Sequence, residues 1–248
     1  MSKPVLYVFS ISHYCEKALW ALEYLGIGYD VRHLAPGLHA KTAKSFNLKS
    51  STLPVLQTDT ETIQGSANII DWADQHATNG KTLTPKNNEQ QAREIEQRLD
   101  DTLGVNTRRF FYSEALVESA HLIRPIFTKD LPLITKIIVS LIWPVITKKM
   151  IAGMDLGFEQ GEESKAIVDE ELAWLEQLLA DGRPYLAGPE FSRADIAAGA
   201  LAARFADAKE HPQAEVIFLP PRAEKTQKHW HDRPTLQHIR QLYKAHRH

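Results

Sequence analysis

One stretch sets the architecture of this chain: Tyr7 to Gly26 reads YVFSISHYCEKALWALEYLG. Val5 to Phe9 is apolar and rich in β-branched and aromatic side chains, which predicts a short buried strand. After Ser10 to Ser12, apolar residues recur at helical spacing up to Gly26, which ends the predicted helix. Ser12 is therefore expected at or just before a helix N-terminus. Free backbone N–H groups and the helix dipole favour an anion there, and a thiolate would be stabilised.

The composition is that of an ordinary globular protein, because 43% of the 248 residues are hydrophobic and 24% are charged. This length allows one large domain or two modest ones. The net charge of −2 gives no global indication of nucleic-acid binding. Cys15 is the single cysteine, so no intrachain disulfide can form and a reducing compartment is favoured. The first residues lack an apolar leader, which predicts a cytoplasmic protein.

The first 78 residues predict a small α/β domain with the order β-α-β-(α)-β-β-α. After the first strand and helix, the pattern predicts a strand at Tyr29–Leu34, a short irregular helix at 38–48, strands at Leu53–Thr58 and Thr62–Gln64, and a helix capped by Ser66. Pro54 is tolerated at the start of its strand because no ladder donor is needed there. Residues 77–88 contain little apolar material and are the best linker candidate.

Residues 89–248 predict an all-helical domain. Helices are expected at Glu89–Leu103, Ala115–Arg124 with Pro125 ending it, Glu163–Leu179, from Phe191–Asp195 to about Ala206, and Thr235–His246, with a loop at 207–222. Ser192 and Asp195 have the spacing of a capping box at the start of the helix that runs to about Ala206.

Residues 131–151 are strongly apolar and approach the length of a membrane span. Lys136, Pro144, Lys148 and Lys149 interrupt them, and charges at membrane depth cost a few kcal/mol each. The sequence therefore predicts no transmembrane segment. It favours a kinked helix pair, with Trp143 and its neighbours lining the apolar side of a substrate cleft. An interfacial helix on a membrane surface is the alternative.

Together these features resemble the cytosolic glutathione transferase superfamily over essentially the whole chain. Ser12 to Lys17 resembles the Ser-x-x-Cys motif of the serine-type classes, and Leu53 to Leu56 resembles the loop whose cis-proline presents a backbone edge to glutathione. Gly65-Ser66 falls where the family has an acidic residue followed by serine. The resemblance implies a thioredoxin-like glutathione-binding domain at 1–78 and an all-α substrate-binding domain at 89–248.

Ser12 is the leading catalytic candidate, because a hydroxyl that donates to sulfur would stabilise the glutathione thiolate. The alternative is that Ser12 only caps its helix. Ser10 competes if the strand ends later, and Tyr7 could activate the thiol, although its strand position favours a core role. Cys15 is expected to be a buried packing residue rather than a nucleophile.

The resemblance assigns the remaining contacts to glutathione. Leu53 and Pro54 would contribute backbone groups, and Ser66 would receive the γ-glutamyl carboxylate. His39, with Lys41 and Lys44, could hold the glycyl carboxylate or could be solvated. Gly65 supplies no charge for the γ-glutamyl ammonium, which predicts weak binding unless an acid of a partner subunit, Asp100 or Asp101, replaces it.

The function favoured by these residues is a glutathione transferase-like enzyme that conjugates or reduces a small hydrophobic electrophile with glutathione. One alternative is a non-catalytic ligand-binding or scaffold protein of the same fold, which Gly65 favours. Another is a glutathione-dependent isomerase similar to prostaglandin synthase, where Cys-x-x-Cys replaces Ser12 to Cys15. The resemblance also implies a homodimer joined near Trp72 and Glu89–Arg98. No metal is expected, because His229 and His231 lack further candidate ligands nearby.

Overall fold

The computed structural model describes residues 2–214 and 218–247. Its N-terminal part is a four-stranded sheet in the order β2-β1-β3-β4, with β1 Val5–Val8, β2 Asp30–His33, β3 Val55–Gln57 and β4 Thr62–Gln64. β1 is parallel to β2 and antiparallel to β3, so that Leu6 lies opposite both Val31 and Leu56. The predicted order of elements in this part is confirmed, with strand ends that differ by one or two residues.

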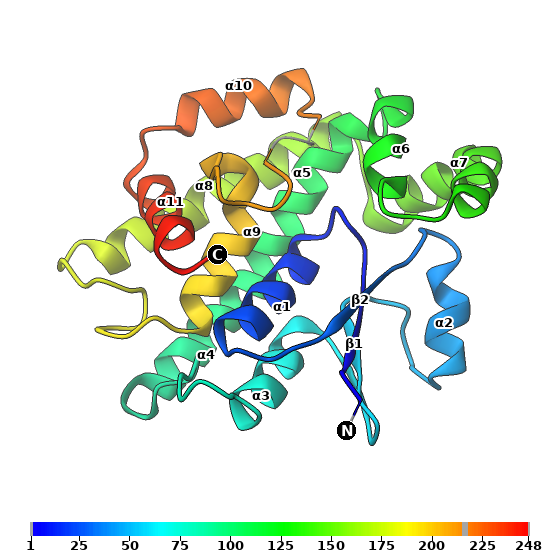
Figure 1. Ribbon diagram of the computed structural model, residues 1–248. Helices are drawn as coiled ribbons and strands as arrows, with labels where there is room; N and C mark the ends of the chain where they lie inside the picture. The colour runs from blue at the N-terminus through cyan, green and yellow to red at the C-terminus, as the bar shows by residue number, and fades with distance from the viewer. Residues whose placement is uncertain (1, 215–217, 248) are drawn as a thin grey trace.

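The sheet carries helices on both faces. α1 (His13–Tyr24) and α3 (Ser66–Gln75) pack against each other on one face, and α2 (His39–Ser45) lies on the other (Figure 1). Ser12 is the N-cap of α1, as the sequence predicts. The prediction that Ser66 caps α3 is wrong by one residue, because Gly65 is the cap and Ser66 is the first helical residue.

The rest of the chain is helical, and its described part contains no strand. A short 3-10 turn at Lys86–Asn88 leads into α4 (Glu89–Arg98), a π-helical segment η2 (Leu99–Gly104), α5 (Val105–Ala115), α6 (Ala120–Thr128), α7 (Leu133–Met154), α8 (Phe158–Leu179), α9 (Arg193–Ala206), α10 (Pro221–Trp230) and α11 (Pro234–His246). This agrees with the predicted fold class, an α/β thioredoxin-like domain followed by an all-α domain.

Three predictions about these helices are wrong. Pro125 lies inside α6 instead of ending a helix, and 133–154 form one helix instead of a kinked pair, with Pro144 inside it. In both places buried apolar contacts, such as those of Phe127 and Trp143, outweigh the hydrogen bond that proline removes. The predicted loop at 207–222 gives way to α10 at Pro221, a residue type that is favoured in the first turn of a helix.

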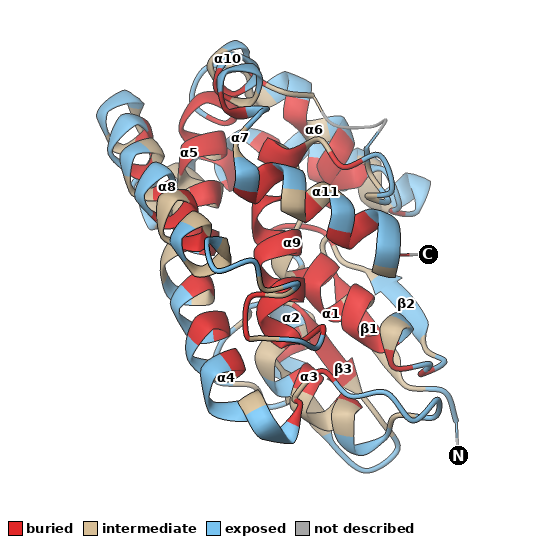
Figure 2. Ribbon diagram, turned by 90° about the vertical axis from the view of Figure 1, so that its left-hand side faces the viewer, coloured by how far each residue is buried: buried red, intermediate tan, exposed pale blue. Residues whose placement is uncertain are grey.

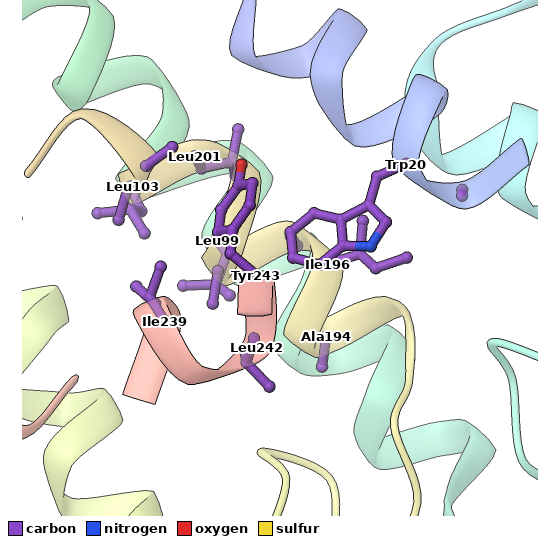
Figure 3. Packing of buried hydrophobic residues seen from close by; sticks show 14 of the residues in the cluster. Trp20, Leu99, Leu103, Ala194, Ile196, Leu201, Ile239, Leu242 and Tyr243 are labelled. Carbon is purple, nitrogen blue, oxygen red and sulfur yellow. The ribbon is translucent and has the colours of Figure 1, made fainter. Parts of the chain in front are cut away.

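α9 is the centre of the helical part, and nearly all of its residues are buried (Figure 2). Its predicted capping box is present, because the side chains of Ser192 and Asp195 each bond the other's backbone. Figure 3 shows Trp20 of α1, Ile196 of α9 and Tyr243 of α11 in one cluster, and the rings of Trp20 and Tyr243 lie 4.4 Å apart. The two parts of the chain therefore share this core.

A second, smaller apolar cluster lies beneath α6 and α7. It joins Val139, Trp143 and Ile146 of α7 to Phe127 of α6 and to Ile11, which precedes α1. The inner face of α7 is thus fixed to the N-terminal part as well as to α6, which positions one wall of the cleft described next.

Candidate functional site

A cleft of about 530 Å³ lies between the sheet domain and helices α5 to α7. The sheet domain contributes Phe9, Ile11, Ser12, His13, Tyr14, Pro36, Gly37, His39, Ser51, Thr52 and Leu53. The helical part contributes Arg108, Tyr112, Phe127, Ile142, Val145, Ile146, Lys149, Met150, Gly153 and Met154. The wall from the sheet domain therefore carries most of the hydroxyl groups, and the helical wall is mainly apolar but also carries Arg108 and Lys149. Such a cleft can hold a polar and an apolar reactant side by side.

Ser12 lies at the N-terminus of α1 on the polar wall. Its Oγ accepts a hydrogen bond from the backbone N–H of Cys15 at 3.3 Å. A hydroxyl has two lone pairs and one proton, so the cap uses only a lone pair and the proton can be donated to sulfur, as the hydrogen bond from Ser12 to the Cys15 thiol indicates. Capping the helix and donating to an anion are therefore compatible roles for one side chain.

The other thiol-activating candidates do not line this cleft. Ser10 pairs its hydroxyl with His33 Nδ1 at 2.9 Å, and the Tyr7 hydroxyl donates to Gln57 Oε1 at 3.1 Å. Cys15 is 1% exposed, and burial raises the pKa of its thiol to about 11. This placement favours Ser12 over Ser10 and Tyr7, and a packing role for Cys15.

The predicted glutathione-binding loop lies at the edge of the cleft. The Leu53–Pro54 peptide bond is cis, and Leu53 lines the cleft. The Gly65 N–H donates to the Pro54 carbonyl at 3.0 Å, which ties the start of α3 to this loop. Pro54, Gly65 and Ser66 are not among the lining residues, so the structure brings them beside the cleft rather than into it.

Gly65 has φ of +94°, a backbone conformation that L side chains rarely adopt. The residue before it does not supply a free polar group either. The Gln64 amide donates to the carbonyls of Ser50 and Thr52, at 3.0 and 2.8 Å. The positive φ gives a structural reason for glycine at this position, independent of any ligand.

His39 lines the cleft, whereas Lys41 and Lys44 are exposed outside it. Its ring packs edge-on against Phe9 at 4.8 Å, and burial lowers the pKa of the imidazole. A neutral imidazole offers a hydrogen bond rather than a charge to a carboxylate. Its Nδ1 is buried and has no side-chain hydrogen-bond partner among the described residues.

His13 and Tyr14, which directly follow Ser12, belong to the site, and the sequence analysis did not identify them. His13 Nε2 donates to the Gly104 carbonyl at 3.0 Å, and the Tyr14 hydroxyl donates to the Asp100 carbonyl at 2.6 Å. Both acceptors belong to η2. A Cβ on Gly104 would lie 2.4 Å from the Tyr14 hydroxyl, so only glycine permits this approach. No local pattern reveals such a pairing across ninety residues.

His13 is held neutral in this position. Burial and the positive charge of Arg108 lower the pKa of its imidazole to about 3. Because Nε2 carries the proton that bonds the Gly104 carbonyl, Nδ1 is left as an acceptor.

Arg108 of α5 is a third residue that the sequence did not single out. It lines the cleft, its Nε is buried without a hydrogen-bond partner, and it forms no ion pair within the described ranges 2–214 and 218–247. Arginine is always charged in proteins, so an unpaired guanidinium at a cleft attracts an anionic group.

Two predictions about helical residues need correction. Trp143 does not line the cleft, because it is 5% exposed, packs on Phe127 and donates its Nε1 to the Ala120 carbonyl at 2.9 Å. Its neighbours Ile142, Val145 and Ile146 do line the cleft. Asp100 is not a free carboxylate for a partner subunit, since its Oδ2 lies 2.5 Å from Lys17 Nζ in the same chain. Asp101 is exposed.

Within the described residues, no group of three or more His, Cys, Asp or Glu side chains is arranged to hold a metal ion. His231 pairs with its neighbour Asp232 at 2.9 Å.

A thioredoxin-like sheet domain, an all-helical domain and a cleft with one polar and one apolar wall define a class of two-domain proteins that bind small molecules. Comparison with known families narrows this class. The model for the glutathione S-transferase N-terminal domain matches residues 6–81, and the model for the glutathione S-transferase C-terminal domain matches residues 159–229. Together the two matches span more than half of the chain. The protein belongs to the cytosolic glutathione transferase superfamily.

Solved structures agree with this fold at low sequence identity. A glutathione S-transferase from Xanthobacter autotrophicus Py2 has a TM-score of 0.63 and 16% identity over 98% of this chain and 93% of that chain. Glutathione transferase GSTFuA3 from Phanerochaete chrysosporium has a TM-score of 0.68 and 13% identity over 99% of this chain and 98% of that chain. The glutathione S-transferase CsGST63524 of Ceriporiopsis subvermispora, solved in complex with glutathione, has a TM-score of 0.63 and 15% identity over 99% of this chain and 98% of that chain. None of the curated proteins compared matches the chain in sequence.

Proposed function

We propose that the protein is a serine-type glutathione transferase that joins glutathione to a small apolar electrophile in the cleft. The observation that carries this proposal is the position of Ser12, at a helix N-terminus on the polar wall and facing a wall of aliphatic side chains. Glutathione would lie against Ser12, Leu53 and Ser66, and the electrophile against α7. The domains would be residues 1–78 and 89–248, in a cytoplasmic protein.

Ser12 would act on the thiol of glutathione. A free thiol has a pKa of about 8.5, so only a minor fraction is thiolate at neutral pH. A hydroxyl proton and the first N–H groups of α1 favour the charged form. The thiolate then attacks the electrophilic carbon, forming an S–C bond while the leaving group or a proton departs. Positioning the two reactants supplies the rest of the acceleration.

Arg108 and His13 would complete the polar side of the site. Arg108 offers a positive charge that no carboxylate of the described chain neutralises, so it would attract the thiolate or a carboxylate of glutathione. His13 is neutral and would accept a hydrogen bond through Nδ1 without adding charge.

A non-catalytic ligand-binding protein of the same fold is the second candidate, and Gly65 favours it. Glycine leaves the γ-glutamyl ammonium without a charged partner from this position. A charge-assisted hydrogen bond contributes roughly 1.5–3 kcal/mol, or about 10- to 150-fold in affinity. We therefore expect weak binding of glutathione, with a dissociation constant near millimolar.

Calorimetric titration with glutathione, followed by an assay with a generic aromatic electrophile, separates the two candidates. Binding together with conjugation above the uncatalysed rate supports the transferase. Binding of apolar ligands without conjugation at saturating glutathione would leave the ligand-binding protein. A low-micromolar dissociation constant would show that another group replaces the missing acid at residue 65.

We further propose a homodimer, as is typical of this family. The candidate interface lies near Trp72 of α3 and along α4. Its exposed side is polar and already carries ion pairs, such as Arg93 with Asp71 at 2.7 Å. Light scattering across the micromolar range should give twice the mass of the chain, and a monomer throughout would contradict the proposal.

A further inference from the structure

The outer face of α7 is an exposed apolar stripe. It consists of Leu133, Ile134, Ile137, Ile138, Leu141 and Val145, and Leu133, Ile134 and Leu141 are 73, 74 and 78% exposed. α7 has 22 residues and is long and apolar enough to cross a membrane by length and composition, but only 22% of its most apolar window is buried. Soluble proteins rarely expose so continuous an apolar surface without a partner for it.

The other face of α7 is already occupied. Val139, Trp143 and Ile146 pack in the second apolar cluster, and Ile142 and Met150 face the cleft. A helix fixed along one side to its own protein cannot be surrounded by lipid. α7 can therefore present only its outer stripe to a partner, lying parallel to whatever surface it meets.

Cationic side chains outnumber acids on α6 and α7. In residues 119–154 the cationic side chains are Arg124, Lys129, Lys136, Lys148 and Lys149, of which Lys149 lines the cleft, and the only acid is Asp130. The acids that flank this range, Glu118 and Asp155, pair with Arg222 and Arg109. Asp130 lies on the side toward the sheet domain, with its Oδ2 3.7 Å from His33 Nδ1.

The facing part of the sheet domain continues this charge. Residues 31–58, which include α2 beside α7 in Figure 1, contain Arg32, Lys41, Lys44 and Lys49 and no Asp or Glu. The chain as a whole has a net charge of −2, so these two segments are more positive than the chain average.

We propose that α7 docks flat on an anionic lipid surface. Its apolar stripe would enter the boundary between headgroups and acyl chains, and the surrounding lysines would contact the headgroups. Val145 belongs to both the stripe and the lining of the cleft, so the two apolar surfaces are continuous. The inference also identifies the electrophile as a lipophilic compound that reaches the cleft from the lipid phase. This second part rests on the proposed transferase function.

A second copy of the chain fits this surface less well. A two-fold interface would place the same patch of both copies face to face. The lysines around the stripe would then meet lysines, and like charges in contact are destabilising. An anionic bilayer neutralises the same charges, which is why the lipid surface is the favoured occupant.

The test is flotation of the wild-type protein with vesicles of phosphatidylcholine alone or with phosphatidylglycerol at three to one. We expect binding to the anionic vesicles that weakens as salt is raised, and about 10-fold less binding to the neutral ones. Ile134→Asp combined with Leu141→Asp should reduce anionic-vesicle binding by about 10-fold or more, because charges enter the apolar stripe. Lys129→Glu combined with Lys148→Glu should remove the preference for anionic lipid.

Val105→Asp is the matched control, because it places the same charge on an exposed apolar position at the start of α5. It should float like the wild type. Circular dichroism should show each variant folded. Neither Ile134 nor Leu141 lines the cleft, so their double variant should keep its activity on a water-soluble electrophile.

Vesicle binding and soluble-substrate conjugation are measured separately, so the inference and the proposed function fail independently. Absence of wild-type binding to anionic vesicles would overturn the inference. Unchanged flotation of the Ile134→Asp/Leu141→Asp variant would overturn it as well. So would light scattering in which that variant halves the mass of the wild type, because the stripe would then join two copies.

Discussion

Ser12 combines two roles that use different atoms of one hydroxyl group. Its oxygen accepts the Cys15 N–H, and the catalytic proposal requires its proton to be donated to the sulfur of glutathione instead of to the Cys15 thiol. Ser12→Ala should lower kcat with an aromatic electrophile by about 10- to 1000-fold, which corresponds to roughly 1.4–4 kcal/mol of transition-state stabilisation. The dissociation constant for glutathione, measured by calorimetry, should change much less.

Ser10→Ala is the control for this substitution, because Ser10 pairs with His33 outside the cleft. It should leave turnover near the wild-type value. Thermal unfolding of both variants should be recorded, since losing the cap alone costs about 1 kcal/mol of stability. If Ser12→Ala turns over as fast as the wild type, another donor stabilises the thiolate.

Gly65 shows how a single backbone angle changes a prediction. An aspartate at position 65 could supply the missing charge for the γ-glutamyl ammonium only if the backbone there had negative φ. The observed φ of +94° does not meet that condition. Gly65→Ala should lower the free energy of unfolding by about 1–3 kcal/mol, because a Cβ is strained in this region.

Gly153→Ala is the matched control in a denaturant titration of Gly65→Ala. Gly153 is an exposed residue of α7, and a Cβ there would meet nothing within 4 Å. It should be neutral or should gain up to about 1 kcal/mol, because alanine favours the helix. Equal effects of the two substitutions would show that residue 65 tolerates a side chain.

The parts of the site that the sequence predicted are those carried by local chemistry. Ser12 follows from a strand, a break and a helical repeat within twenty residues. No local pattern predicts the roles of Arg108 and His13, because their importance depends on α5 lying across the N-terminus of α1. Trp143 was misplaced for the same reason, since spacing fixes which residues share a helix face but not which face meets the cleft.

Among the secondary-structure elements, α9 offers the clearest pH-dependent test. The Asp195 carboxylate accepts hydrogen bonds from Leu186 N–H at 2.8 Å and Ser192 N–H at 2.9 Å. Burial nevertheless raises its pKa from 3.8 to about 6. The native state then binds more protons than the unfolded state between about pH 4 and pH 6, so this group's contribution to stability falls as pH rises through that window.

Asp195→Asn should remove this dependence, because the amide keeps an acceptor and does not titrate. The difference in free energy of unfolding between wild type and variant should shrink by roughly 3 kcal/mol from pH 4 to pH 7, with the wild type favoured at low pH. Urea titrations at half-unit pH steps measure it. A difference that is constant with pH, or that grows as pH rises, would show that the buried carboxylate is ionised at low pH.

Strong periodic patterns predicted the elements well, and tertiary packing decided the exceptions. The capping box at Ser192 and the stripe of α8 are local signals. η2 has no such signal, because its π-helical turn accompanies contacts of Tyr14 and His13 from far along the chain. α6 likewise continues through Pro125 because Ile126 and Phe127 are buried behind it.

At the scale of the whole molecule, charged side chains join segments that the sequence gives no reason to pair. Arg247, near the C-terminus, bonds Glu16 of α1 through its Nε at 2.9 Å and also pairs with Glu23. The fold class and domain order were predictable from patterns within each half. The relative placement of the halves was not, because it depends on such distant pairs.

The central pair of this kind is Arg193 with Glu96, both buried. Arg193 also bonds Asp71 of α3 at 2.6 Å and the Ala67 carbonyl at 3.1 Å, and Glu96 lies 2.7 Å from Lys17 of α1. The guanidinium therefore joins both halves of the protein. Arg193→Met should lower the free energy of unfolding by about 3–5 kcal/mol, because it leaves the buried Glu96 carboxylate without this partner.

A double-mutant cycle with Glu96→Gln separates lost pairing from lost packing. Once Glu96 carries no charge, Arg193→Met should cost about 0.5–3 kcal/mol less than in the wild type, as measured by denaturant unfolding. If Arg193→Met alone does not fold, Arg193→Lys keeps the charge, loses the fork that reaches four partners at once, and should still be destabilised. Additive costs in the cycle would mean that the two side chains stabilise the molecule independently, and the joining of the halves would then rest on the apolar core around Trp20.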